Sequence, residues 1–113
     1  MKVAIVGSRE YHDLDAVRRY VRSLPAGTTV VSGGARGVDK VAELEAEACG
    51  LPTEIHHAQW EQFGKSAGFQ RNVSIVEASD RVVAFWDGSS RGTRHTMTLA
   101  ERYGKPLEVF GSK

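Results

Sequence analysis

The chain has 113 residues, of which 41% are hydrophobic and 26% charged. This balance excludes wholesale disorder and predicts that residues 1–113 form a single compact domain. The formal net charge of +1, the lack of a long apolar run and the lack of a secretory pattern in MKVAIVG predict a cytoplasmic protein that contacts no membrane.

The first half of the chain alternates short apolar runs with helical patterns. Residues 2–6, KVAIV, predict a strand buried on both faces, and residues 14–24 follow with apolar positions at helical spacing. Residues 28–32 predict a second strand, and residues 37–49 a second helix that ends before Gly50 and Pro52. Residues 53–57, TEIHH, predict a weaker third strand.

The second half repeats the alternation after an irregular stretch at residues 58–68. Residues 69–79 predict a helix with Phe69, Val73 and Val76 on one face, and 81–86, RVVAFW, a fourth strand. A helix is predicted from about Thr93, and residues 107–110 predict the last strand.

Strands that alternate with helices predict an α/β fold. Specifically, the order indicates a three-layer, Rossmann-like architecture: a parallel five-stranded sheet with helices on both faces. In such sheets, ligands bind outside the carboxyl ends of the strands, near the point where the strand order reverses. The loops that follow the strands are therefore the place where functional residues are expected.

Arginines gather in or next to these loops, whereas the loops at the opposite edge contain none. A guanidinium group can bind a phosphate or a carboxylate through two parallel hydrogen bonds. The asymmetry predicts an anionic ligand at this edge. The arginines concerned are Arg9, Arg36, Arg71, Arg91 and Arg94.

Two of the loops, SGGARGVD and DGSSRGTRHT, combine glycines with hydroxyls and the start of a helix. Glycines let backbone N–H groups approach an anion, and a helix N-terminus carries partial positive charge. Neither loop matches G-x-G-x-x-G or a P-loop, so no dinucleotide or NTP cofactor is predicted. The adjacent His56 and His57 have no Cys, Asp or Glu at a familiar metal spacing, so no metal is predicted.

The motifs VGSR, SGGARGVD, GFQRN and DGSSRGTRHTMTLA occur in this order on the expected loops and helices. With them, nearly the whole chain resembles a SLOG-superfamily Rossmannoid domain of the small stand-alone YspA/YpsA-like branch. The Rossmann-like domain of the DNA-processing protein A family and the "Lonely guy" phosphoribohydrolases are similar. The resemblance implies recognition of a nucleotide or a nucleotide derivative, possible single-stranded DNA binding, and self-association as a homodimer.

The resemblance also implies which residues bind the ligand. Residues after the first two strands would line the pocket and meet phosphate or ribose, Arg71 and Asn72 would reach in from a helix, and the last loop would cradle the phosphate. The predicted set, with Asp39, Asp87 and Arg91 added, is Gly7, Ser8, Arg9, Ser32, Gly33, Gly34, Arg36, Asp39, Arg71, Asn72, Asp87, Gly88, Ser89, Ser90, Arg91, Gly92 and Thr93.

One departure concerns catalysis. The phosphoribohydrolases carry a glutamate that works with an arginine to cleave the N-glycosidic bond, and Thr96 occupies the position of that glutamate. A threonine hydroxyl cannot serve as a general base near neutral pH. If the protein is an enzyme, Arg71 and Asp87 are the candidate catalytic residues, although a turn-capping role for Asp87 is favoured.

Three functions therefore remain open. Binding of a nucleotide-derived small molecule, as a sensor, is the leading hypothesis. Hydrolysis of a nucleoside monophosphate is the second, and single-stranded DNA binding, which the net charge of +1 disfavours, is the third. Two side-chain roles also stay open. Asp39 either binds a ribose hydroxyl or interacts favourably with the dipole of its own helix. Trp60 and Phe63 either stack on a base or pack over the sheet edge.

Overall fold

A computed structural model describes residues 1–111 of the chain. Its strands form one sheet with the order β3-β2-β1-β4-β5, and all neighbouring strands are parallel. The predicted α/β class with a parallel five-stranded sheet is thereby confirmed. The strands are β1 (Lys2–Gly7), β2 (Thr29–Ser32), β3 (Thr53–Ile55), β4 (Arg81–Trp86) and β5 (Leu107–Gly111).

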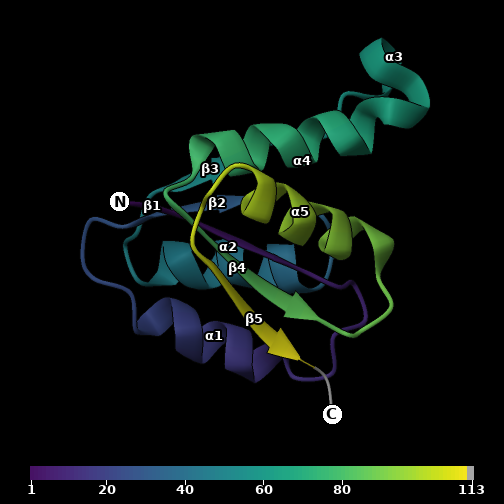
Figure 1. Ribbon diagram of the computed structural model, residues 1–113. Coiled ribbons are helices and arrows are strands. Elements are labelled where there is room, and N and C mark those ends of the chain that lie inside the picture. Colours follow the sequence, from purple (N-terminus) through teal and green to yellow (C-terminus); the bar gives the residue numbers. More distant parts are fainter. Residues whose placement is uncertain (112–113) are drawn as a thin grey trace.

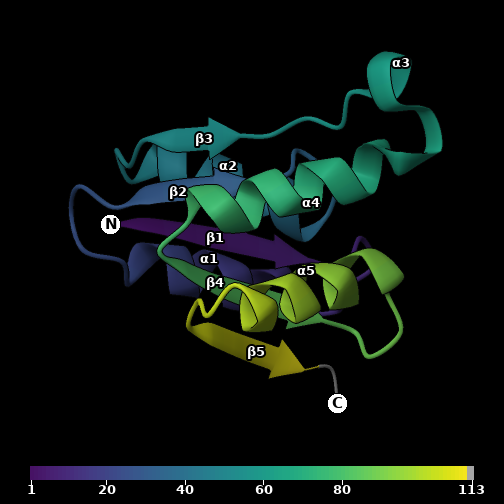
Figure 2. The same cartoon turned by 45° about the horizontal axis from the view of Figure 1, so that its top comes forward.

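Helices cover both faces of this sheet (Figure 1). Helices α1 (Leu14–Arg22) and α2 (Val38–Ala48) pack on one face, and α4 (Ala67–Ala78) and α5 (Arg91–Arg102) pack on the other. The short α3 (Trp60–Phe63) and a 3-10 turn at Gly64–Ser66 project from the body of the molecule, as Figures 1 and 2 show.

The core divides into two layers because side chains alternate along each strand. In β1, Val3 and Ile5 face α1 and α2, whereas Ala4 and Val6 face α4 and α5. Strand β4 repeats the alternation, so both central strands are buried on both faces, as their apolar runs predict. The strand order reverses between β1 and β4, which places their carboxyl ends at the switch point of the sheet.

The element boundaries differ from the predictions at the functional edge. The stretch 58–68, predicted to be irregular, contains α3, and α4 begins at Ala67. Helix α5 begins at Arg91, before Thr93, because Ser90 takes an extended conformation and its side chain caps the helix. The third strand ends at Ile55, so His56 and His57 follow the strand instead of belonging to it.

One core prediction is wrong. Phe69 is 62% exposed, whereas Val76 of the same predicted face is buried. Phe69 lies in the first turn of α4, where the helix extends past the sheet, and its ring packs beside His95 with 4.5 Å between centroids. Within residues 1–111, the structure contains no helix that combines the length and the apolar character needed to cross a membrane.

Candidate nucleotide-binding site

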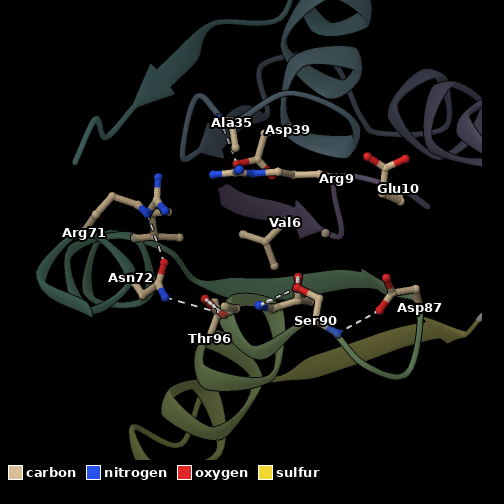
Figure 3. A pocket seen from close by; sticks show the side chains of 14 residues that line it. Val6, Arg9, Glu10, Ala35, Asp39, Arg71, Asn72, Asp87, Ser90 and Thr96 are labelled. Atoms are coloured by element: carbon tan, nitrogen blue, oxygen red, sulfur yellow. Dashed lines mark hydrogen bonds between the residues drawn. The ribbon is translucent and has the colours of Figure 1, made fainter. Parts of the chain in front are cut away.

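A cavity of about 360 Å³ lies at the carboxyl ends of β1 and β4, where the strand order reverses. Val6 and Ile75 contribute to its apolar lining. Polar side chains from α2, α4 and the start of α5 lie around Val6 (Figure 3). The predicted residues that the structure brings together around it are Gly7, Arg9, Asp39, Arg71, Asn72, Asp87, Ser90, Gly92 and Thr93.

Ser8, a predicted ligand residue, joins the loops after β1 and β4 instead of lining this cavity. It is buried, its backbone N–H donates to the carbonyl of Phe85 at 3.0 Å, and its Oγ accepts from the backbone N–H of Asp87 at 3.1 Å. Ser8 therefore fixes the two loops that meet at the switch point.

Arg71 is fixed by two hydrogen bonds, one to the loop after β2 and one to its neighbour in α4. Its Nη1 donates to the carbonyl of Gly33 at 2.8 Å, and its Nε donates to Oδ1 of Asn72 at 3.0 Å. The Asn72 amide in turn contacts Nδ1 of His95 at 3.0 Å and the carbonyl of Gly92 at 3.4 Å. The guanidinium group is thus part of a network that connects three elements at the cavity wall.

His95 of α5 also belongs to this network. Burial lowers the pKa of its imidazole, and the charge of Arg102 adds to the effect. A neutral imidazole has one unprotonated nitrogen, so Nδ1 can accept from the amide of Asn72. This favours a positioning role for His95 between α4 and α5.

The loop SGGARG differs from the predicted phosphate cradle because Asp39 of α2 already fills it. The Asp39 carboxylate accepts from the backbone N–H of Ala35 at 3.3 Å. Ser32 is buried, and its hydroxyl donates to Oε2 of Glu43 at 2.6 Å. Ser32, Gly33, Gly34 and Arg36 accordingly do not line this cavity, whereas Asp39 and Ala35 do.

A side chain at position 33 would crowd Arg71 and Asp39, whereas the backbone angle of Gly33 does not require glycine. A Cβ atom at this position would lie 2.8 Å from Nη1 of Arg71 and 2.9 Å from Oδ2 of Asp39. Any larger residue would displace these two side chains. The glycine therefore lets a cation and a carboxyl group approach the same point of the loop.

Asp39 carries the largest change in acidity at the site. Burial raises the pKa of its carboxyl to about 6, although the N–H of Ala35 and the charge of Arg71 oppose the shift. Asp39 as a whole is only 6% exposed. It can therefore exchange a proton near neutral pH at a position that faces the cavity.

Asp87 stabilises the turn that begins the loop DGSSRGT. Its Oδ1 accepts from the backbone N–H groups of Ser89 at 2.9 Å and Ser90 at 2.8 Å. Gly88 has a φ of +88°, which favours glycine at this point of the turn. The two N–H bonds hold the pKa of the Asp87 carboxyl below its usual range, which is unfavourable for a general base. Gly88 and Ser89 do not line the cavity.

The first turn of α5 supplies the wall opposite Asp39. Ser90 caps the helix by accepting from the N–H of Thr93, and Gly92 and Thr93 line the cavity. Thr96, at the glutamate position of the hydrolases, also lines it, but its hydroxyl donates to the carbonyl of Gly92 at 3.2 Å. Backbone N–H groups at a helix N-terminus favour an anion.

The predicted arginines separate into two groups. Arg9 and Arg71 line the cavity, whereas Arg91 and Arg94 are exposed on α5. Arg36 is also exposed and lies 3.5 Å from a carboxylate oxygen of Glu10, which lines the cavity. The cavity therefore contains two guanidinium groups beside the carboxyl groups of Glu10, Asp39 and Asp87.

Sequence reasoning missed four lining residues: Val6, Glu10, Ala35 and Ile75. Val6 and Ile75 carry the periodicity of ordinary core residues. Ala35 lies inside the SGGARGVD motif, and Glu10 follows the VGSR motif, but neither side chain has the chemistry that singled out its neighbours. Within residues 1–111, no group of three His, Cys, Asp or Glu side chains is arranged to hold a metal ion.

Comparison with known proteins agrees with this architecture. Residues 1–63 match the model of the YAcAr family, the YspA, cpYpsA-related SLOG family. The chain belongs to the YAcAr family. The family resemblance inferred from the four motifs is confirmed.

The chain is also similar to a phage protein in sequence and to a DNA-processing protein in structure. The chain is 40% identical over 122 residues to the Gene 61 protein of Mycobacterium phage D29, covering 99% of this chain and 98% of the phage protein. It also superposes with a TM-score of 0.83 on DNA processing protein A from Helicobacter pylori, a single-stranded DNA-binding protein, at 25% identity. That match covers 100% of this chain but 66% of the Helicobacter chain.

Proposed function

We propose that this YAcAr domain binds a nucleotide or a nucleotide-derived small molecule in the cavity at the carboxyl ends of β1 and β4. The observation that carries the proposal is the pairing of a fixed guanidinium group, Arg71, with the first turn of α5 in one cavity. Both groups favour an anion, and they approach it from different elements. A cavity of about 360 Å³ is within the size range of small-molecule sites.

The charges around the cavity support a small ligand with one anionic group over a long polyanion. Glu10, Asp39 and Asp87 lie beside Arg9 and Arg71, so a DNA backbone threaded through the cavity would meet three carboxyl groups. A nucleotide combines a phosphate with ribose hydroxyls and a base. Its phosphate would face Arg71 and α5, and its hydroxyls would donate to the carboxyl of Asp39.

Isothermal titration with the four nucleoside monophosphates and ADP-ribose tests the proposal. We expect saturable binding of at least one of them, and at least tenfold weaker binding for Arg71→Ala, since a hydrogen bond to a charged group contributes about 1.5–3 kcal/mol. Arg22→Ala is the matched control, because Arg22 lies at the end of α1, pairs with Glu45 and does not line the cavity. Absence of binding by every compound, or equal affinities of the parent and Arg71→Ala, contradicts the proposal.

Chromatography of the same mixtures separates binding from hydrolysis. The fixed turn role of Asp87 and the hydrogen bond from Thr96 to Gly92 favour recovery of the intact nucleotide. Release of the free base would instead support the phosphoribohydrolase alternative. Loss of that release in Asp87→Asn would then assign Asp87 to catalysis.

Single-stranded DNA binding is the second candidate, and the match to DNA processing protein A favours it. Exposed Arg91 and Arg94 on α5 offer contacts for a phosphate backbone outside the cavity. Fluorescence anisotropy of a labelled oligothymidylate at rising salt tests this candidate. Affinity that falls steeply with salt supports it, because phosphate contacts release counterions. Absent or salt-independent binding dismisses it.

A further inference from the structure

A second cavity, of about 490 Å³, adjoins the first at the side chain of Arg71, which lines both. It lies between the end of β3, the projecting α3 and the outer face of α4. Its lining includes His57, which follows β3, Phe63 of α3 and Gln70 of α4. The two cavities are therefore neighbouring compartments with one guanidinium group between them.

The side chains of the second cavity differ in kind from those of the first. Phe63 offers a ring face, and Gln59 and Gln70 offer carboxamides, each with a donor and an acceptor side by side. Among the described residues that line it, none carries a carboxylate, and Arg71 is the one permanent cation. Such a set suits a flat, uncharged heterocycle with hydrogen-bonding edges better than a second phosphate.

The aromatic residue in this cavity has an accessible side chain and a backbone held by hydrogen bonds. Phe63 is 39% exposed, and its backbone N–H donates to the carbonyl of Gln59 at 2.9 Å. The Ser66 hydroxyl donates to the carbonyl of Phe63 at 2.9 Å, which closes the turn that follows. A ring that is fixed at its backbone but open to solvent is suited to stack on a planar group.

We infer that the second cavity is a nucleobase subsite. Phe63 stacks on the base, Gln59 and Gln70 meet its edge, and Arg71 lies between the base and the phosphate. The inference rests on the proposed function, because it requires the ribose phosphate to occupy the first cavity. It also assigns the ligand class: a nucleotide that keeps its base.

Titration of the four nucleoside monophosphates beside ribose 5-phosphate tests this subsite. The tightest-binding nucleotide is expected to bind at least tenfold more tightly than ribose 5-phosphate. Phe63→Ala is expected to weaken the binding of that nucleotide about tenfold, since base stacking on an aromatic residue contributes about 1–3 kcal/mol. The same variant leaves the affinity for ribose 5-phosphate unchanged. Tyr103→Ala, an exposed aromatic at the far end of α5, is the control and changes neither affinity.

Gln70→Ala provides an independent variant in case the loss of Phe63 disturbs α3. It is expected to lower the affinity for the nucleotide and not the affinity for ribose 5-phosphate. Gln62→Ala, which lies outside the cavity lining, is expected to change neither affinity. Equal affinities for nucleotide and ribose 5-phosphate, or variants that weaken both ligands alike, overturn the subsite while leaving the first cavity intact. Failure of both ligands to bind the parent protein overturns the proposed function and the subsite together.

Discussion

At the scale of single residues, the site depends on groups of opposite charge that meet at Gly33. Arg71 and Asp39 approach the same side of this glycine, and Asp39 occupies the N–H group that an anion would otherwise use. The glycine-rich pattern predicts an anion cradle in the loop after β2, and in the structure the carboxyl group of Asp39 accepts a hydrogen bond from this loop. Sequence spacing does not reveal this, because the contact depends on how α2 begins.

The ionisation of Asp39 predicts a stability that depends on pH. The folded-state pKa of about 6 lies above the ordinary value of 3.8, so folding favours the protonated form. The parent protein therefore loses free energy of unfolding as pH rises from about 4 to 6, and the loss persists above 6. Asp39→Asn keeps an oxygen acceptor for Ala35 and removes the charge. It is expected to be more stable than the parent at pH 7.5 by about 2–3 kcal/mol.

Urea denaturation of the parent and Asp39→Asn at pH 4 and pH 7.5 measures this difference. The advantage of the variant is expected to shrink at pH 4, where the carboxyl of the folded parent is protonated. Glu47→Gln, an exposed acidic residue in the same helix, is the control and shows little difference at either pH. An advantage of equal size at both pH values would contradict the buried, ionisable role of Asp39.

At the scale of elements, the first turn of α5 is stabilised from outside the helix. Ser90 accepts from the N–H of Thr93, and the indole N–H of Trp86 donates to the carbonyl of Ser90 at 3.0 Å. The sequence predicts this helix, but the predicted start lies near Thr93, because the run DGSSRG has the composition of a turn. The capping hydrogen bonds, which composition does not show, extend the helix to Arg91.

Ser90→Ala tests the contribution of this cap. Loss of a serine cap costs about 1 kcal/mol in the free energy of unfolding. We expect that loss for Ser90→Ala in urea denaturation at pH 7.5, and less than half of it for Ser89→Ala, whose side chain is exposed. If the two variants are equally stable, the hydroxyl of Ser90 does not hold the first turn of α5.

At the scale of the whole molecule, the fold was predictable and the details of the site were only partly so. The alternation of buried strands such as VAIV and VVAF with amphipathic helices specifies a parallel sheet, and the edge that binds ligands follows from it. Which loop residues enter the cavity depends on hydrogen bonds between distant segments. Ser8 shows this: its motif predicted a ligand contact, but its partners are Phe85 and Asp87.

Self-association also belongs to this scale and stays a prediction of the family resemblance. The exposed rings of Trp60 and Phe69 at α3 and the start of α4 are available for contact with a second copy of the chain. Sedimentation velocity is expected to detect a homodimer, and Phe69→Ser is expected to shift it toward monomer. A monomer at all concentrations of the parent protein would contradict the prediction.

Ligand binding at the edge formed by the carboxyl ends of β1 and β4 underlies all of these proposals. Titration of the ¹⁵N-labelled protein with the nucleoside monophosphates, followed by amide chemical shifts, tests it most directly. The largest saturable changes are expected at Gly7, Arg9, Asn72, Gly92 and Thr93, all of which line the first cavity. Changes concentrated at the opposite edge, in residues 25–28 and 50–52, or no saturable change with any nucleotide, would contradict it.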